Sequence, residues 1–139
     1  MDDFIYFIKY GVLLGLGMDS TPVDVIHIFG TPHHIYEEPQ HSTIYNYGAI
    51  EFIFGRKGIA SLEIHINDND CHINIPGVED FKNISYETFL ERISELSLGY
   101  KKGKIIGNEF VLLFNKSGKA TFKDNKLTTI SIIDPESIY

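Results

Sequence analysis

The sequence is poor in several residue types that mark particular classes of protein. Its 139 residues include one cysteine, Cys71, and no tryptophan. A single cysteine cannot form an internal disulfide, which excludes a disulfide-stapled scaffold and agrees with a reducing compartment. The apolar stretch 4–16 is interrupted by Lys9 and is too short to cross a bilayer, and Asp2 and Asp3 stand where a secretory signal needs basic residues. We therefore expect a cytoplasmic protein with no membrane partner.

Positive charge is also scarce, and it is unevenly distributed. The formal net charge is −7, made up of −10 over residues 1–98 and +3 over residues 99–139. Nucleic-acid binding depends on clustered Lys and Arg, so a nucleic-acid partner is not expected. With 43% hydrophobic and 22% charged residues, the composition is that of an ordinary globular chain, and its length suits a single domain, 1–139.

The segment "TPVDVIHIFGTP" predicts a short helix with both ends marked. Thr21 is an N-cap candidate, Pro22 fits the first helical position, and Asp24 completes a capping-box spacing. Gly30 and Pro32 then end the helix. The apolar positions at helical spacing are Val23, Ile26 and Phe29. Because so short a helix is unstable alone, we expect this apolar stripe to pack on a sheet.

Strand patterns follow this helix directly. Residues 44–54 are rich in aromatic and β-branched residues, and Gly48 predicts a bend or a break between two strands. After a turn at "GRKG", residues 59–66 alternate, with Leu62, Ile64 and Ile66 on one face. This alternation is typical of an antiparallel sheet that is buried on one face and wet on the other.

The same order of elements then recurs. Ser85 begins a second predicted helix that stops near Gly99, and three short strands follow at 108–114, 119–123 and 127–133. The strand pairs of the two halves align at an offset of 68 residues, and the helix starts lie 64 apart. We predict an α+β fold, an antiparallel sheet with helices packed on one face, and a tandem duplication of a helix-then-β-meander unit over 14–66 and 84–133. Chance matching of apolar strands is the alternative.

The residue types that carry chemistry form no convincing constellation. His33 and His34 precede Glu37 and Glu38, but adjacent side chains on an extended chain point to opposite sides. The "NDNDCH" segment lacks the glycine and distal glutamate of a calcium loop, and Cys71 beside His72 is only adjacency. We therefore predict no catalytic residues, no bound metal and no cofactor.

The segment 14–66, read as "LGMDSTPVDVIHIFGTP", "YNYGAIEFIF" and "IASLEIHI", resembles the opening of small bacterial immunity proteins. The tandem helix-then-sheet layout is similar to the beta-lactamase-inhibitor-like fold. The resemblance implies a non-catalytic protein that binds and neutralises a cognate toxin made by the same cell, a nuclease being one such toxin. Outer-membrane assembly lipoproteins carry a related helix with Gly-Pro punctuation, but this chain lacks their lipobox cysteine and signal segment.

Acidic loops and tyrosines supply the candidate partner-binding residues, because charge complementarity steers association and aromatic side chains anchor interfaces. These candidates are Tyr36, Glu37, Glu38, Tyr45, Tyr47, Asp68, Asp70, Glu79 and Asp80. Two alternatives remain open for them: solvated loop charges for the acids, and packing against the sheet for the tyrosines. For the whole chain, the alternative functions are a small enzyme or ligand-binding protein with a pocket of His33, His34 and Tyr45, and an assembly adaptor.

Overall fold

The fold, given by a computed structural model, is described for residues 1–37, 42–66, 75–115 and 117–134. The helices are α1 (Asp3–Tyr10), α2 (Pro22–Phe29), the short 3-10 helix η1 (Val78–Phe81) and α3 (Tyr86–Glu95). The strands are β1 (His34–Glu37), β2 (Thr43–Asn46), β3 (Ile50–Gly55), β4 (Gly58–His65), β5 (Tyr100–Ile106), β6 (Glu109–Phe114), β7 (Gly118–Lys123) and β8 (Lys126–Ile133). Among the described residues, no helix combines the length and the apolarity needed to cross a membrane.

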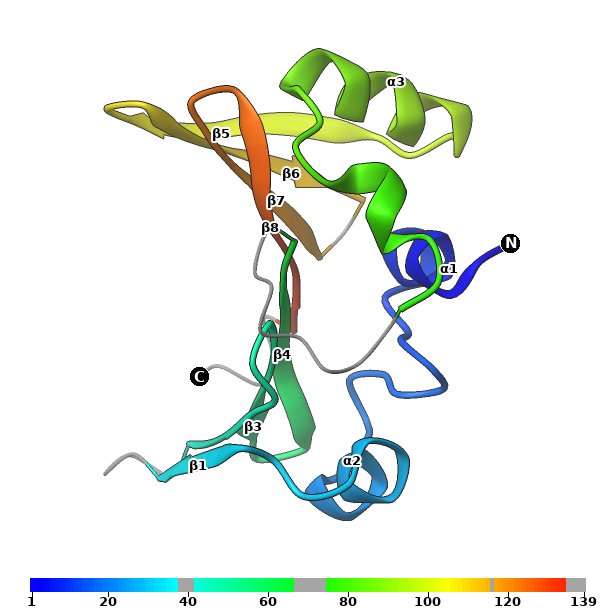
Figure 1. Ribbon diagram of the computed structural model, residues 1–139, viewed down its shortest axis with the longest axis vertical. Coiled ribbons are helices and arrows are strands. Elements are labelled where there is room, and N and C mark those ends of the chain that lie inside the picture. The colour runs from blue at the N-terminus through cyan, green and yellow to red at the C-terminus, as the bar shows by residue number, and fades with distance from the viewer. Residues whose placement is uncertain (38–41, 67–74, 116, 135–139) are drawn as a thin grey trace.

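The strands form one antiparallel sheet of eight strands in the order β1-β2-β3-β4-β8-β7-β6-β5. The α+β class and the antiparallel sheet are thus confirmed. In the part of the chain that the structure describes, the helices all lie on one side of the sheet (Figure 1). The sheet is strongly twisted, since β5 and β1 lie across the view while β4 runs along its vertical axis (Figure 1).

Two four-stranded meanders meet at the centre of this sheet, where β4 pairs with β8. The β3–β4 register recurs in β7–β8 at an offset of 68 residues, so that Phe54 pairs with Ile59 and Phe122 pairs with Leu127. A bulge precedes the phenylalanine in both pairs of strands. The offset predicted from sequence therefore describes the strand pairing of both halves.

Helix α2 begins and ends where the sequence predicts. The Thr21 hydroxyl accepts a hydrogen bond from the Asp24 N–H at 3.3 Å, while the Asp24 carboxylate accepts one from the Thr21 N–H at 2.9 Å. These hydrogen bonds to Thr21 lower the pKa of Asp24. Gly30, at φ +78°, ends the helix.

The predicted apolar stripe of α2 is correct at Phe29 but wrong at its other two positions. Val23 is 75% exposed and Ile26 is 40% exposed, whereas Val25 is fully buried and Phe29 packs on the core. Since this helix is apolar at nearly every position, spacing alone could not select the face that packs on the sheet.

The core lies between the sheet and the helices. Helix α1 contributes Phe4, Phe7 and Ile8, all buried and spaced as one helical face. The sequence predicts a core segment here but not a helix. In α3, Phe89 and Ile93 lie four residues apart and are both buried, and the Phe89 ring lies 5.6 Å from that of Phe122 on β7.

Candidate functional site

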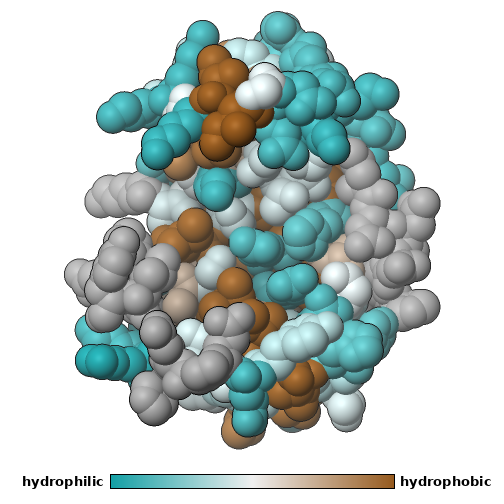
Figure 2. Space-filling view, turned by 90° about the vertical axis from the view of Figure 1, so that its left-hand side faces the viewer, coloured by the Kyte–Doolittle hydropathy of each residue, from teal (hydrophilic) through white to brown (hydrophobic). Residues whose placement is uncertain are grey.

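The face of the sheet that points away from the helices, called the open face below, is the broadest candidate site. Figure 2 shows this face, with hydrophilic side chains through its middle and hydrophobic patches above and below them. Strand pleating determines which residues lie on it, because successive side chains point to opposite faces. The strand pairing therefore predicts which side chains form rows across it.

One row of paired residues crosses all eight strands of the open face. From β1 to β5 it comprises His34, Asn46, Glu51, Glu63, Ser131, Lys119, Leu113 and Lys101. We call it the polar row. Both of its carboxylates lie in the first meander and both of its ammonium groups lie in the second, so the row is acidic at one end and basic at the other.

The acidic end consists of a cluster of polar side chains that lie close to one another. Asn46 donates a side-chain hydrogen bond to Glu51 at 3.0 Å. The His65 Nε2 atom lies 3.9 Å from a Glu51 oxygen and 3.8 Å from a Glu63 oxygen, and His65 Nδ1 lies 3.3 Å from the Thr129 hydroxyl. The two glutamate side chains are 29% and 33% exposed, so both carboxylates are partly buried and still reachable from solvent.

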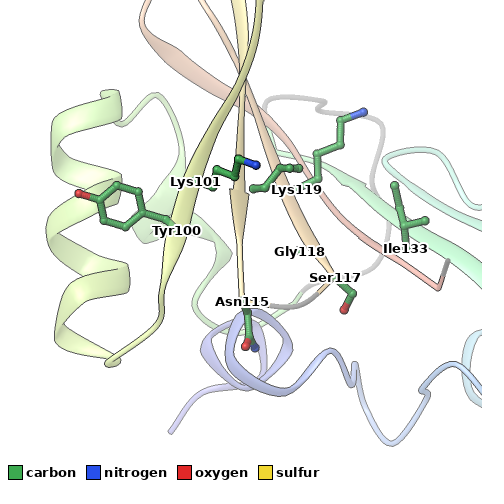
Figure 3. Close-up of a pocket in the computed structure, with 8 residues that line it drawn as sticks. Tyr100, Lys101, Asn115, Ser117, Gly118, Lys119 and Ile133 are labelled. Carbon is green, nitrogen blue, oxygen red and sulfur yellow. The ribbon is translucent and has the colours of Figure 1, made fainter.

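The basic end of the row borders a pocket of about 430 Å³. Its lining residues are Tyr100, Lys101, Leu113, Asn115, Ser117, Gly118, Lys119 and Ile133. Figure 3 shows Lys101 on β5 and Lys119 on β7, with Tyr100 pointing away from both. Within the described residues neither lysine has a carboxylate within 4.0 Å, so both positive charges are available to a partner.

A second row on the open face, called the apolar row, consists mainly of apolar side chains. It comprises Tyr36, Ile44, Ile53, Ser61 and Ile133, from β1 to β8. Tyr36 is 51% exposed, while Ile44, Ile53 and Ile133 are half-buried. The open face thus places apolar area beside a row of charged side chains. Within the described residues, no three His, Cys, Asp or Glu side chains form a group that could hold a metal ion.

The predicted partner-binding residues that the structure describes do not come together in one place. Tyr36 and Glu37 are exposed on the edge strand β1. Glu79 and Asp80 are exposed on η1, on the helical side of the sheet (Figure 1), and Glu79 is paired with Lys82 at 2.9 Å. Glu38, Asp68 and Asp70 lie outside the described residues.

Two of the predicted tyrosines pack against the sheet, which was the alternative to partner contact. Tyr45 is half-buried with its ring 5.0 Å from that of Phe54. Tyr47 is only 2% exposed, and its hydroxyl donates a 2.8 Å hydrogen bond to the Gly30 carbonyl at the end of α2. Tyr47 therefore belongs to the core and cannot contact a partner as predicted.

The buried Tyr47 predicts a pH-dependent contribution to stability. Burial raises the pKa of Tyr47 to about 12, and the neighbouring Tyr45 adds to this. A raised tyrosine pKa means that the folded state holds the proton more tightly, so the contribution is complete below the unfolded pKa of about 10 and is lost as the pH rises through about 12. Relative to Tyr47→Phe, the wild type should be about 1 kcal/mol more stable at pH 8. By pH 12 the wild type should have lost about 2 kcal/mol relative to Tyr47→Phe, so that the variant is then the more stable of the two.

Urea unfolding of both proteins between pH 8 and pH 12 measures this difference. The phenylalanine variant is the matched control, because the other tyrosines and the lysines titrate equally in both proteins. A difference in unfolding free energy that stays constant over this range would contradict the packing of Tyr47.

The proposed histidine pocket receives no support from the geometry. His33 and His34 are exposed at the start of β1, and the described pockets are lined by other residues. The residues of the polar row were not predicted from the sequence. Glu51 and Glu63 lie on separate strands, and their direct pairing in β3–β4 becomes visible only in the structure.

No protein-family model matches the sequence. No curated protein matches it either. Among solved structures, an extracellular protein containing an SCP domain from Bacillus anthracis str. Ames is similar at 12% identity, with a TM-score of 0.49. That similarity covers 87% of this chain and 45% of the other, so this chain spans less than half the length of the protein it matches.

Proposed function

We propose that this protein is a non-catalytic immunity protein that binds a cognate bacterial protein toxin across the open face and neutralises it. The observation that carries the proposal is the eight-stranded sheet whose open face presents the polar row beside the apolar row. An apolar strip gives contact area, and ordered charges give orientation and association rate. A toxin that must be inhibited within the cell that makes it implies action in the cytoplasm.

The open face is wide because, in this proposal, the sheet arose by tandem duplication of a helix-then-β-meander unit. Three observations support duplication: the common 68-residue offset of β3–β4 and β7–β8, the bulge at the same place in both, and the side-chain N-caps Thr21 and Ser85 of α2 and α3. The central pairing agrees, since Glu63 lies opposite Ser131, also 68 residues later. Joining the two units at β4 and β8 doubles the width available to a partner.

An enzyme or a small-ligand receptor is the competing class, and it fits the geometry less well. The described carboxylates on the open face are held by His65 and Asn46 beside a broad surface. General acid–base catalysis needs a reactant held against the proton-transferring group, which an open sheet face does not provide. A protein partner, in contrast, is broad enough to cover a surface of this kind.

The proposal predicts that reversing the acidic end of the row abolishes neutralisation. The polypeptide encoded next to this protein is expressed as the toxin, and growth and binding are measured with wild-type protein and with Glu51→Lys/Glu63→Lys. Like charges placed opposite each other at an interface cost several kcal/mol, so we expect binding to weaken by about 100-fold and growth protection to disappear.

The matched control is Glu91→Lys/Glu95→Lys, which makes the same change in net charge on exposed positions of α3, on the helical side of the sheet. It should bind within about 2-fold of wild type, since exposed charges distant from an interface act weakly. Equal loss in both double variants would assign the effect to net charge and would contradict binding through the open face. Absence of protection by the wild type would overturn the immunity function itself.

A further inference from the structure

We infer that the pocket at the basic end of the polar row receives a carboxylate side chain of the protein partner. The partner is therefore polarised, which means that its charges are arranged in an order complementary to that of the row. An acidic residue of the partner lies against Lys101 and Lys119, and basic residues of the partner lie over Glu51 and Glu63. This inference rests on the proposed function and names the chemistry of the partner. It also replaces the expectation of a uniformly acidic binding surface.

The lining of the pocket suits a single acidic side chain. Lys101 and Lys119 lie on the two strands that flank β6, and both pair in register with Leu113 between them. Leu113 and Ile133 add apolar walls, which would contact the methylene groups of an aspartate or glutamate. A volume of about 430 Å³ is at the low end for ligand-binding clefts, and it accommodates one side chain with its flanking backbone.

The pocket is a local region of positive charge on a chain whose net charge is negative. The chain as a whole has a net charge of −7, which repels free anions. Lys104 lines a smaller adjoining pocket together with Leu113 and Lys119, so the positive region continues along β5. An anion placed at this end of the sheet is therefore attracted, although the chain as a whole repels it.

The acidic end of the polar row favours a protein over a polyanion as the partner. Glu63 lies only two strands from Lys119, separated by Ser131, and Glu51 lies one strand further. A nucleic-acid backbone that covered the row would place phosphates against both carboxylates, which is unfavourable. A folded protein can present an acidic and a basic group at fixed positions, and it thereby also fixes the direction in which it docks.

Nuclear magnetic resonance with two small probes tests the pocket directly. The ¹⁵N-labelled full chain is titrated with N-acetyl-aspartate methylamide and with its neutral isostere N-acetyl-asparagine methylamide. We expect saturable shifts at Leu113, Gly118 and Lys119 with the acidic probe, and affinity about 5-fold weaker for the neutral probe, because each exposed ion pair contributes modestly. Lys101→Gln/Lys119→Gln should abolish this preference, whereas Lys57→Gln, exposed in the β3–β4 turn, should retain it.

Each other outcome contradicts the inference. Equal binding of both probes, or shifts elsewhere on the chain, would show that the lysines do not select a carboxylate. Tighter binding of inorganic phosphate than of the acidic probe would assign the pocket to a free anion. Shifts at both ends of the row that grow with protein concentration, without any probe, would assign it to a second copy of this chain.

The toxin assay separates this inference from the proposed function. Lys101→Glu/Lys119→Glu should weaken toxin binding by about 10-fold or more, as reversal of the acidic end does. If the wild type protects cells and this variant protects them equally, the polarised partner is wrong while the immunity function stands. Because both lysine side chains lie on the open face outside the core, circular dichroism of the variant checks that the fold is retained.

Discussion

Phe122→Ala is expected to lower the free energy of unfolding by about 4 kcal/mol, since truncating a buried phenylalanine removes its hydrophobic transfer energy and leaves a cavity. Phe122 is fully buried on β7, stacked on Phe110 at 5.0 Å. The rings of Tyr86 and Phe89, both on α3, lie 5.6 Å away. The side chain therefore joins α3 to the second meander, and its loss should loosen both.

Urea unfolding monitored by circular dichroism measures this effect. Leu113→Ala is the control, because Leu113 is 43% exposed on the open face of the neighbouring strand and its truncation should cost less than about 1.5 kcal/mol. Phe54→Ala adds an informative comparison, since Phe54 occupies the corresponding place in β3. A loss below about 1.5 kcal/mol for Phe122→Ala would show that α3 does not pack on β7 as described.

The parts of the fold that were predictable are those whose local chemistry agrees with their tertiary role. The sequence predicts that Thr21 and Ser85 begin helices, and both residues are N-caps in the structure. Gly48, at φ +86°, separates β2 from β3 as its position among strand-forming residues suggests. Capping and turn chemistry act within a few residues, so one sequence contains the information.

The edge strands were missed because they bury almost nothing. All four residues of β1 are exposed, and every residue of β5 except Gly103 is exposed. Neither strand has the alternation that marks a half-buried strand, and β5 carries three lysines and a glycine. Their backbone hydrogen bonds to β2 and β6 hold them, and no local pattern reveals such pairing.

Helix α1, unlike the edge strands, carries local signals in the sequence. Its N-cap, Asp2, accepts a hydrogen bond from the Ile5 N–H at 2.8 Å, and Gly11 ends it at φ +71°. Both signals were present in the sequence, but the apolar run between them indicated only burial. A cap search at Asp2 would have identified the helix.

The candidate site could not be predicted, because it depends on pairing between distant strands. The polar row exists only because β4 pairs with β8, which places Glu63 opposite Ser131. The sequence shows an acidic first part and a basic second part, yet it does not show that both charges line one face. A one-residue change of register would move every side chain of the row to the other face of the sheet.

The two halves also differ in one turn, where the first half depends on glycine. The turn between β3 and β4 leads into Gly58, at φ +125°, whereas the corresponding position in β8 is Lys126. The second half instead turns through Asp124 and Asn125, at φ +51° and +59°. Gly58 has an additional role, because the Ile59 N–H donates a 3.0 Å hydrogen bond to the Ser20 carbonyl in the loop before α2.

Gly58→Ala should therefore be severely destabilising, by about 4 kcal/mol, from a steric clash added to an unfavourable backbone conformation. A Cβ atom at Gly58 would lie 2.5 Å from the Ser20 carbonyl oxygen and 3.1 Å from the Met18 carbonyl oxygen. Backbone atoms cannot rotate away as a flexible side chain can, so the loop before α2 would have to leave β4. Gly15→Ala is the matched control, at φ +85° with no atom within 4 Å of the added Cβ, and should cost only about 1–2 kcal/mol. Urea unfolding gives both values, and hydrogen exchange at the Ile59 amide reports the loop contact directly. Equal destabilisation by the two substitutions would mean that the loop does not pack against β4, and the anchoring of α2 to the first meander would then be wrong.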